Sequence, residues 1–251
     1  MIKIEHDFSG LLRNFDDIEK KQIPFALSLG INRTASRVKE AEIKEMKDVF
    51  DRPTPYILSA IFVKPSTKKN LSATVWIKDQ ATKAVPASKI LTPQITGGVR
   101  RLKRFELALR SAGVLPSNYF TVPGQGATYD AFGNMSRGQI VQILSYFNAF
   151  SESGFKANAT DKTREKLRRG TKKKFGISYF AVQPGDSATT PGIYQRVHTA
   201  FGDAIKPVLI FVDRVYYDPI FDFAFVAKRV NEKYFGEEFS KALEYALKTA
   251  K

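Results

Sequence analysis

The chain has 251 residues, of which 43% are hydrophobic and 26% charged, so it is long enough to bury a sizeable core, and this composition excludes wholesale disorder. It contains no cysteine, which excludes disulfides, thiolate nucleophiles and cysteine-ligated metal sites. The net charge is +15, but residues 1–50 carry nine basic and nine acidic side chains, and residues 201–251 carry eight of each. The whole excess therefore lies between residues 51 and 200, which predicts one basic face and a polyanionic or acidic partner.

The first residues of the chain have neither the basic start nor the apolar core of a secretory signal. No segment approaches the roughly 18 apolar residues of a membrane span. We therefore expect a protein that is made in the cytosol and has no membrane partner.

A long amphipathic helix is predicted for residues 24–50. Pro24 falls where the first turn of a helix tolerates proline, and apolar residues then recur at helical spacing. This stripe consists of Leu27, Ile31, Ala35, Val38 and Met46. Beyond the helix, residues 56–64 and 71–79 are rich in β-branched and aromatic residues around a polar connection, which predicts a β-hairpin.

An inserted pair of helices is predicted between residues 80 and 150. Residues 80–97 are expected to form a loop, and residues 98–116 an amphipathic helix. Residues 118–134 are rich in glycine, proline and turn residues, which predicts a loop of the kind used for binding or assembly. Ser136 is a candidate N-cap for the second helix.

Residues 151–175 are predicted to form a basic flexible segment. Between residues 162 and 174 the chain has eight Lys or Arg side chains and one Glu in thirteen positions, with no aromatic residue for base stacking. Such a run binds phosphates without reading sequence, faces an acidic neighbouring subunit, or is a solvated face, and all three readings stay open. The candidate DNA-facing or partner-facing residues are Lys162, Arg164, Lys166, Arg168, Arg169, Lys172, Lys173 and Lys174.

The C-terminal part of the chain predicts three strands and a long closing helix. The strands are expected at residues 177–182, 192–198 and 207–215. The helix is expected to begin with Asp218 as N-cap and Pro219 in its first turn.

Together these elements predict an α+β protein, with a small, mostly antiparallel sheet packed against long N- and C-terminal helices. We expect a single domain over residues 1–251, with a core from residues 1–80 and 175–251. The helical insertion spans residues 80–150 and the basic flexible segment residues 151–175. In this arrangement the neutral ends build the core, and the basic middle is free to project outward.

No catalytic, cofactor or metal site is predicted. His6 and His198 are the only histidines and are far apart in sequence, which disfavours a histidine-based catalytic site or a two-histidine metal site. Gly124 and Gly126 lack the flanking residues of a phosphate-binding loop. Aspartates that suit Mg²⁺ lack the closely spaced Glu and Lys of a nuclease site. These aspartates are Asp186, Asp203, Asp213, Asp218 and Asp222.

Both ends of the chain resemble the phage minor tail protein Z family of tail-completion proteins. Residues 23–46, IPFALSLGINRTASRVKEAEIKEM, are similar to the family's opening helix and its Ala/Gly-x-Asn-Arg-x-Ala pattern. The pattern falls on Gly30, Asn32, Arg33 and Ala35. Residues 218–248 are similar to the family's closing helix. The candidate assembly positions that the resemblance implies are Asn32, Arg33, Phe221 and Phe235.

The resemblance implies a structural virion protein of a tailed phage, a tail-completion or neck component at the head–tail connector, which acts by assembly and is not an enzyme. The partners it implies are further copies in a symmetric ring, the portal, adaptor or tail-tube proteins, and packaged DNA through non-specific contact. The location it implies is the head–tail junction or upper tail of the virion, with no cofactor. The alternatives are a sequence-independent nucleic-acid-binding phage protein in replication or packaging, and a nuclease.

Overall fold

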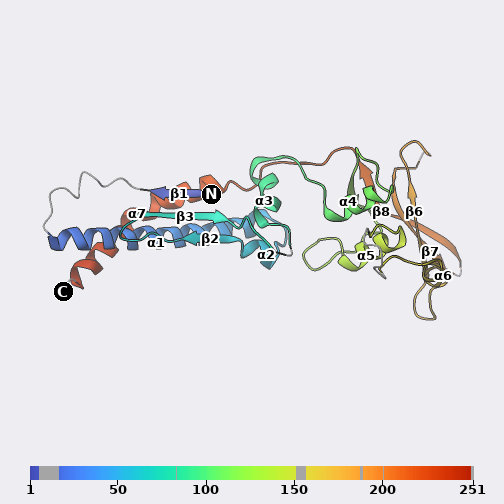
Figure 1. Ribbon diagram of the computed structural model, residues 1–251, viewed down its shortest axis with the longest axis horizontal. Helices are drawn as coiled ribbons and strands as arrows, with labels where there is room; N and C mark the ends of the chain where they lie inside the picture. Colours follow the sequence, from blue (N-terminus) through green and yellow to red (C-terminus); the bar gives the residue numbers. More distant parts are fainter. Residues whose placement is uncertain (6–16, 83, 151–156, 187–188, 200, 250–251) are drawn as a thin grey trace. The chain divides into compact units, whose positions relative to one another are not determined.

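The computed structural model describes residues 1–5, 17–82, 84–150, 157–186, 189–199 and 201–249. The fold is α+β, with antiparallel sheets and long helices near both ends of the chain, as the sequence predicts (Figure 1). The chain divides into two compact units, each with its own hydrophobic core. Unit 1 comprises residues 1–98 and 217–251, and unit 2 comprises residues 99–216.

Unit 1 contains a three-stranded antiparallel sheet in the order β1-β3-β2. These strands are β1 (Ile2–Glu5), β2 (Ile61–Lys64) and β3 (Ser72–Ile77). β2 and β3 are the predicted hairpin, and β1 adds a third strand that the sequence pattern did not reveal. Ala73 and Val75 of β3 are fully buried while their neighbours are partly exposed, the alternation expected of a sheet with one covered face.

Two long helices, α1 (Asp17–Val49) and α7 (Phe223–Lys248), pack along each other and against this sheet (Figure 1). Small residues allow the helices to approach closely, because a Cβ added to Gly30 would lie 3.0 Å from the Cα of Phe239. The other small residues in this contact are Ala26, Ala242 and Ala246. All five residues of the predicted apolar stripe on α1 are fully buried, which confirms that prediction.

The start of α7 differs from the prediction. Asp222 is the N-cap, and its carboxylate accepts a hydrogen bond from the amide of Phe225 at 2.9 Å. Asp218 lies four residues too early for this role, since residues 218–222 are not yet helical. The segment expected to be a loop also contains a helix, α3 (Ala87–Thr96), whose Ala87 and Leu91 are buried. An internal proline and a proline at the cap position hide this helix from sequence patterns.

Unit 2 contains a four-stranded antiparallel sheet in the order β5-β8-β7-β6. The strands are β5 (Phe120–Pro123), β6 (Gly176–Val182), β7 (Gly192–Thr199) and β8 (Gly202–Val212). β5 pairs with β8 only at residues 209–212, so the far half of the β7–β8 hairpin extends beyond it. Three helices accompany the sheet, namely α4 (Arg104–Ser111), α5 (Arg137–Tyr146) and α6 (Asp161–Arg169).

The structure therefore differs from the predicted single domain, whose core was expected to consist of residues 1–80 and 175–251. The strands after residue 175 do not extend the sheet of unit 1; they pair with one another and with β5, which lies inside the segment predicted to be a loop. The chain enters and leaves unit 2 through β4 (Gly98–Val99) and β9 (Tyr216–Tyr217), which form a two-stranded pair. In the described part of the chain, no helix has the length and apolar character needed to cross a membrane.

Candidate functional site

The positive charge is concentrated in unit 2. Residues 99–216 contain 18 Lys and Arg against eight Asp and Glu, whereas the remainder of the chain contains 22 against 17. Ten of the fifteen excess positive charges therefore belong to unit 2. A surface that attracts a polyanion is expected on this unit.

The first half of the basic run forms helix α6, which is docked on unit 2. The Thr160 side chain caps it by accepting a hydrogen bond from the Thr163 amide. Leu167 packs against the core of unit 2, and Arg164 Nε donates to the Tyr146 carbonyl oxygen at 3.0 Å. Residues 161–169 of the predicted flexible segment thus form a packed helix, because one apolar and one basic side chain anchor it. The first six residues of that segment, 151–156, lie outside the described residues.

Two basic side chains of α6 already have acidic partners on the same helix. Arg164 pairs with Asp161 at 2.9 Å, and Arg169 pairs with Glu165 at 3.0 Å. A surface groove of about 420 Å³ has both signs of charge along its walls, from Asp161, Lys162, Glu165, Lys166 and Arg169. Such mixed charge weakens the attraction for a phosphate, so α6 is not the strongest anion site of the run.

The second half of the basic run is a tight turn with three exposed lysines. The Thr171 amide donates to the Lys174 carbonyl oxygen at 2.8 Å, and the Lys174 amide donates back to the Thr171 carbonyl oxygen at 3.2 Å. The Thr171 hydroxyl oxygen also accepts from the amides of Lys173 and Lys174. Lys172, Lys173 and Lys174 are exposed, and the turn contains no acidic residue. This turn therefore presents three positive charges on a fixed backbone.

Two glycines close the base of this turn. Gly170 has φ +70°, in the region that favours glycine, and a Cβ added to Gly176 would lie 1.7 Å from the carbonyl oxygen of Arg168. The two backbone segments therefore touch where the turn leaves the body of unit 2. We call residues 170–176 the lysine turn.

Replacing Gly176 by Ala is expected to lower the free energy of unfolding of unit 2 by about 1–3 kcal/mol, because the methyl group overlaps backbone that must move. The measurement is urea unfolding followed by far-ultraviolet circular dichroism. The sole tryptophan, Trp76, lies in β3 of unit 1, so its fluorescence reports on that unit in the same sample.

A matched glycine variant is Gly236→Ala on α7, where an added Cβ would meet nothing within 4 Å. It is expected to stabilise unit 1 by about 0.5–1 kcal/mol through helix propensity. Equal stability of Gly176→Ala and the parent chain would contradict the close contact at the base of the lysine turn.

An exposed aromatic ring stands next to the lysines. Phe175 directly follows Lys174, and 66% of its surface is exposed. Exposed lysines bind phosphates, and an exposed ring gives a base a surface on which to stack. Phe175 lies just beyond the last lysine of the basic run, and its exposure is not apparent from the sequence pattern.

Asn32 has a role inside unit 1. Its Nδ2 donates to the Ser66 carbonyl oxygen at 3.1 Å, and its Oδ1 accepts from the Ser66 amide at 2.7 Å. These two bonds hold the connection after β2 against α1. Arg33, the next residue of the pattern, is partly exposed on α1.

The two phenylalanines proposed as assembly positions pack within unit 1. Phe221 is 1% exposed and makes edge contacts with Phe50 and Phe223, so as an assembly position it is wrong. Phe235 is partly buried against the same core and stacks on Phe239. Both rings therefore contribute to the packing of unit 1.

His198 joins a series of polar contacts across three strands. Its Nδ1 lies 2.8 Å from Asp203 Oδ1, and its Nε2 lies 3.2 Å from Ser178 Oγ. Serine hydrolases use side chains in this order, but acyl transfer also needs donors aimed at an oxyanion. Here Arg196 shares the Asp203 carboxylate, at 3.6 Å, and His198 is directly opposite Asp203 in the β7–β8 register. We therefore assign this series to holding the hairpin together.

The aspartates of the C-terminal half are not gathered into a metal site in the described residues. Within the described ranges, no three or more His, Asp or Glu side chains are grouped so that they could hold a metal ion. His6, the other histidine, lies outside those ranges.

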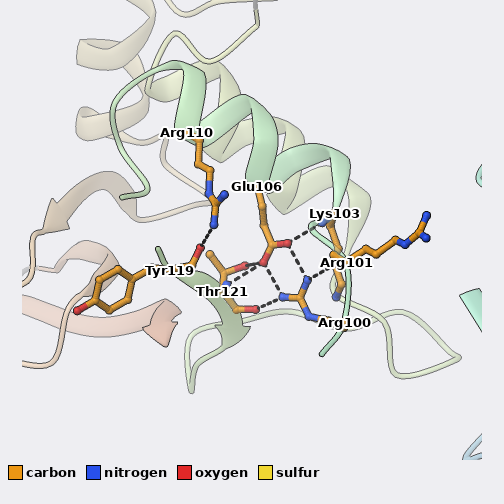
Figure 2. A network of polar contacts seen from close by, with 7 residues as sticks. All are labelled: Arg100, Arg101, Lys103, Glu106, Arg110, Tyr119 and Thr121. Carbon is orange, nitrogen blue, oxygen red and sulfur yellow. Dashed lines mark hydrogen bonds and ion pairs between the residues drawn. The ribbon is translucent and has the colours of Figure 1, made fainter. Parts of the chain in front are cut away.

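A buried ion pair fixes α4 to β5 (Figure 2). Arg100 donates from Nη1 to Glu106 Oε2 at 2.7 Å and from Nη2 to Glu106 Oε1 at 2.5 Å. Glu106 also accepts from the amides of Lys103 and Thr121, and Arg100 donates to the Thr121 carbonyl oxygen. Arg100 falls within the helix predicted for residues 98–116, whereas in the structure it precedes α4 and is 6% exposed.

The pKa of Glu106 reflects this environment. Burial alone would raise the pKa of the carboxyl group, but the hydrogen bonds from Arg100, Lys103 and Thr121 outweigh burial and hold the pKa below its ordinary value. The carboxylate is therefore ionised at neutral pH, and every one of its bonds is made within unit 2. The network stabilises the unit that carries the lysine turn.

No known family model matches the sequence, and no curated protein or solved structure is significantly similar to the chain. What the protein does must therefore be inferred from its residues and their geometry.

Proposed function

We propose that the protein is a structural component of a tailed-phage particle, at the head–tail connector or in the upper tail, which acts by assembly and presents the lysine turn to DNA. The observation that carries the proposal is the lysine turn itself, with three exposed lysines and an exposed Phe175 on a closed backbone loop. It belongs to the unit that has most of the excess positive charge. A particle component beside the path of DNA needs such a surface.

The resemblance of both chain ends supports the same proposal. The residues that carry the resemblance lie on α1 and α7, which pack together as the main body of unit 1. In this proposal unit 1 is the part shared with tail-completion proteins, and unit 2 adds the basic surface. The partners are further copies of the chain in a ring and the portal, adaptor or tail-tube proteins, and the location is the virion.

Contact with DNA through the lysine turn would be independent of base sequence. Lysine ammonium groups bind phosphates as point charges, and each phosphate contact releases counterions, so affinity falls as salt rises. The logarithm of the binding constant falls with the logarithm of salt concentration by about 0.9 per phosphate contact on a duplex. Three lysines thus account for a slope of up to roughly 2.7.

A second candidate function is a nucleic-acid-binding phage protein that acts in replication or packaging without reading sequence. Phe175 favours it, because a single strand gains from stacking whereas the bases of a duplex are already stacked. Replacing Phe175 by Ala is therefore the change that separates the two functions. It should weaken single-strand binding roughly tenfold in the second function and leave duplex binding unchanged in the first.

The location of the protein is tested on purified phage particles by mass spectrometry and by gold labelling of a tag at Lys251. We expect the protein in particles, with label at the junction of head and tail. Recovery of the protein only on DNA in infected cells, with none in particles, would rule out the structural proposal and favour the second function.

DNA contact is tested with a triple substitution of Lys172, Lys173 and Lys174 by Ala. Duplex binding is expected to weaken, and the salt slope to decrease by up to roughly 2.7, while the fold is retained because these side chains are exposed. The measurement is fluorescence anisotropy with a labelled duplex over a series of salt concentrations.

The matched control makes the same change of charge on unit 1. It replaces three exposed lysines there by Ala, namely Lys44, Lys47 and Lys89. This variant should keep the parent slope, which shows that position and not net charge decides binding. Equal slopes for both triple variants would remove the lysine turn as the DNA contact.

A further inference from the structure

Unit 2 has a cavity between α4, α5 and the sheet, with a mainly apolar interior and polar residues at its opening. Its volume is about 340 Å³, at the lower end of the roughly 300–1,000 Å³ range of pockets that bind small molecules. Of its apolar side chains, Leu209 is buried, and Phe105, Met135 and Ile140 are partly buried. Lys103 and Asn134 also line the cavity but are exposed, which places them at its opening.

Lys103 is the single charged residue that lines this cavity, and its side chain has no hydrogen bond or ion pair with the described residues. The Glu106 carboxylate does not neutralise it, because that carboxylate accepts hydrogen bonds from Arg100, Thr121 and the Lys103 amide. Arg100, Lys103 and Glu106 together have two positive charges and one negative charge. The opening of the cavity therefore has an excess positive charge that a bound anion would neutralise.

The surroundings of Lys103 disfavour its charged form. Burial and, next, the charge of Arg100 lower the pKa of the Lys103 ammonium group, and Glu106 offsets only part of this effect. A carboxylate bound beside the ammonium group would favour the charged form again and raise this pKa. Part of the Lys103 side chain is thus exposed, while its charged end lacks both full hydration and a partner.

We propose that this cavity binds a small organic acid, whose aromatic or branched apolar body lies inside and whose carboxylate pairs with Lys103. The apolar body matches the side chains that form the interior, and the single negative charge matches the single cation at the opening. The Asn134 amide, which also has no hydrogen bond to the described residues, can donate to the same carboxylate. The site is independent of the proposed function, because no residue of the lysine turn lines it.

Methionine methyl groups provide a direct test of binding. The chain has three methionines, of which Met135 lines the cavity and Met46 is buried in the core of unit 1. In nuclear magnetic resonance spectra of the full-length protein with isotope-labelled methionine methyl groups, para-toluate should shift the Met135 signal to saturation and leave Met46 unchanged. Met135→Leu identifies the signal. The dissociation constant expected for a ligand of this size is about 1 mM or lower.

The charge at the opening is tested with Lys103→Met, which keeps an apolar stem and the amide bond to Glu106. It should weaken para-toluate binding roughly 10–100-fold, as for the loss of a hydrogen bond to a charged group. The matched control is Arg104→Met, which removes the same charge from an exposed residue that does not line the cavity and should leave binding unchanged. The neutral para-toluamide has the same ring and should bind the parent chain and Lys103→Met equally.

The affinity for para-toluate should also fall as pH rises through the lowered pKa of Lys103, while the affinity for para-toluamide stays constant. A Met135 signal that does not move at about 10 mM para-toluate would overturn the proposal. So would equal affinity of para-toluate for the parent chain and Lys103→Met, or an equal shift of the Met46 signal. None of these results changes the test on phage particles, so this site and the proposed function stand or fall separately.

Discussion

Replacing Glu42 by Gln is expected to raise the free energy of unfolding of unit 1 by roughly 2–5 kcal/mol at pH 8. Glu42 lies on the buried face of α1 and is 0% exposed, and neither carboxyl oxygen has a hydrogen-bond partner among the described residues. Burial raises the pKa of this carboxyl group to about 9, with smaller contributions from Glu45 and Asp222. The folded chain therefore holds a proton there at neutral pH.

The sign of the pH dependence follows from this raised pKa. Between the ordinary value of 4.5 and about 9, the folded state keeps the Glu42 proton while the unfolded state has lost it. The folded state binds more protons, so stability falls as pH rises, by up to about 1.4 kcal/mol per pH unit. Glutamine has nearly the same shape and no proton to lose, so it removes this dependence.

The measurement is urea unfolding of the parent chain and Glu42→Gln from pH 5 to pH 9, followed by Trp76 fluorescence. The control is Glu40→Gln on the exposed side of the same helix, which should keep the slope of the parent. If Glu42→Gln shows the same slope as the parent chain, the carboxyl group is ionised and has found a partner or water.

Replacing Arg100 by Met is expected to destabilise unit 2 by about 3–5 kcal/mol, because the buried Glu106 carboxylate would lose its cation. Arg101, which is exposed on the same segment, is the control, and Arg101→Met should change stability by less than about 0.5 kcal/mol. The measurement is urea unfolding followed by circular dichroism, with Trp76 fluorescence as the reference for unit 1.

The Glu106 partner supplies a second check. The double variant Arg100→Met with Glu106→Gln leaves no charge buried and should recover much of the loss. The lowered pKa of Glu106 also fixes a sign, since the stability it contributes is present above the ordinary value of 4.5 and is lost as pH falls through its lower folded pKa. A double variant no more stable than Arg100→Met would show that packing, and not the uncompensated charge, causes the loss.

In unit 1 the sequence predicted the stripe of α1 and the β2–β3 hairpin because these patterns are local, whereas it missed β1 and α3. The apolar stripe of α1 and the alternation of β3 are read from neighbouring residues, and both are confirmed. The same stripe skips position 42, where the sequence has Glu, and the structure buries that residue in line with Val38 and Met46. A pattern of apolar residues does not reveal a buried carboxyl group, whose place depends on what α7 and the sheet cover.

The division into two units was missed because it depends on pairing between distant strands. β5 is a four-residue strand within a glycine-rich and proline-rich segment, and its partner β8 lies more than 80 residues later. Local propensity says nothing about such a pair. The basic run was predicted to be flexible, because its fold into α6 and the lysine turn depends on the contacts of Leu167 and the close approach of Gly176.

The pairing of β4 with β9 brings together the two points at which the chain enters and leaves unit 2. Unit 2 is inserted between residues 98 and 217, and the two ends of the insertion are hydrogen-bonded neighbours. Deleting or exchanging the 118 residues between them leaves two chain ends that already lie side by side, and it interrupts neither the three-stranded sheet nor α1 and α7. Recombination can therefore gain, lose or replace unit 2 as a cassette, and genes that share only unit 1 are the expected relatives.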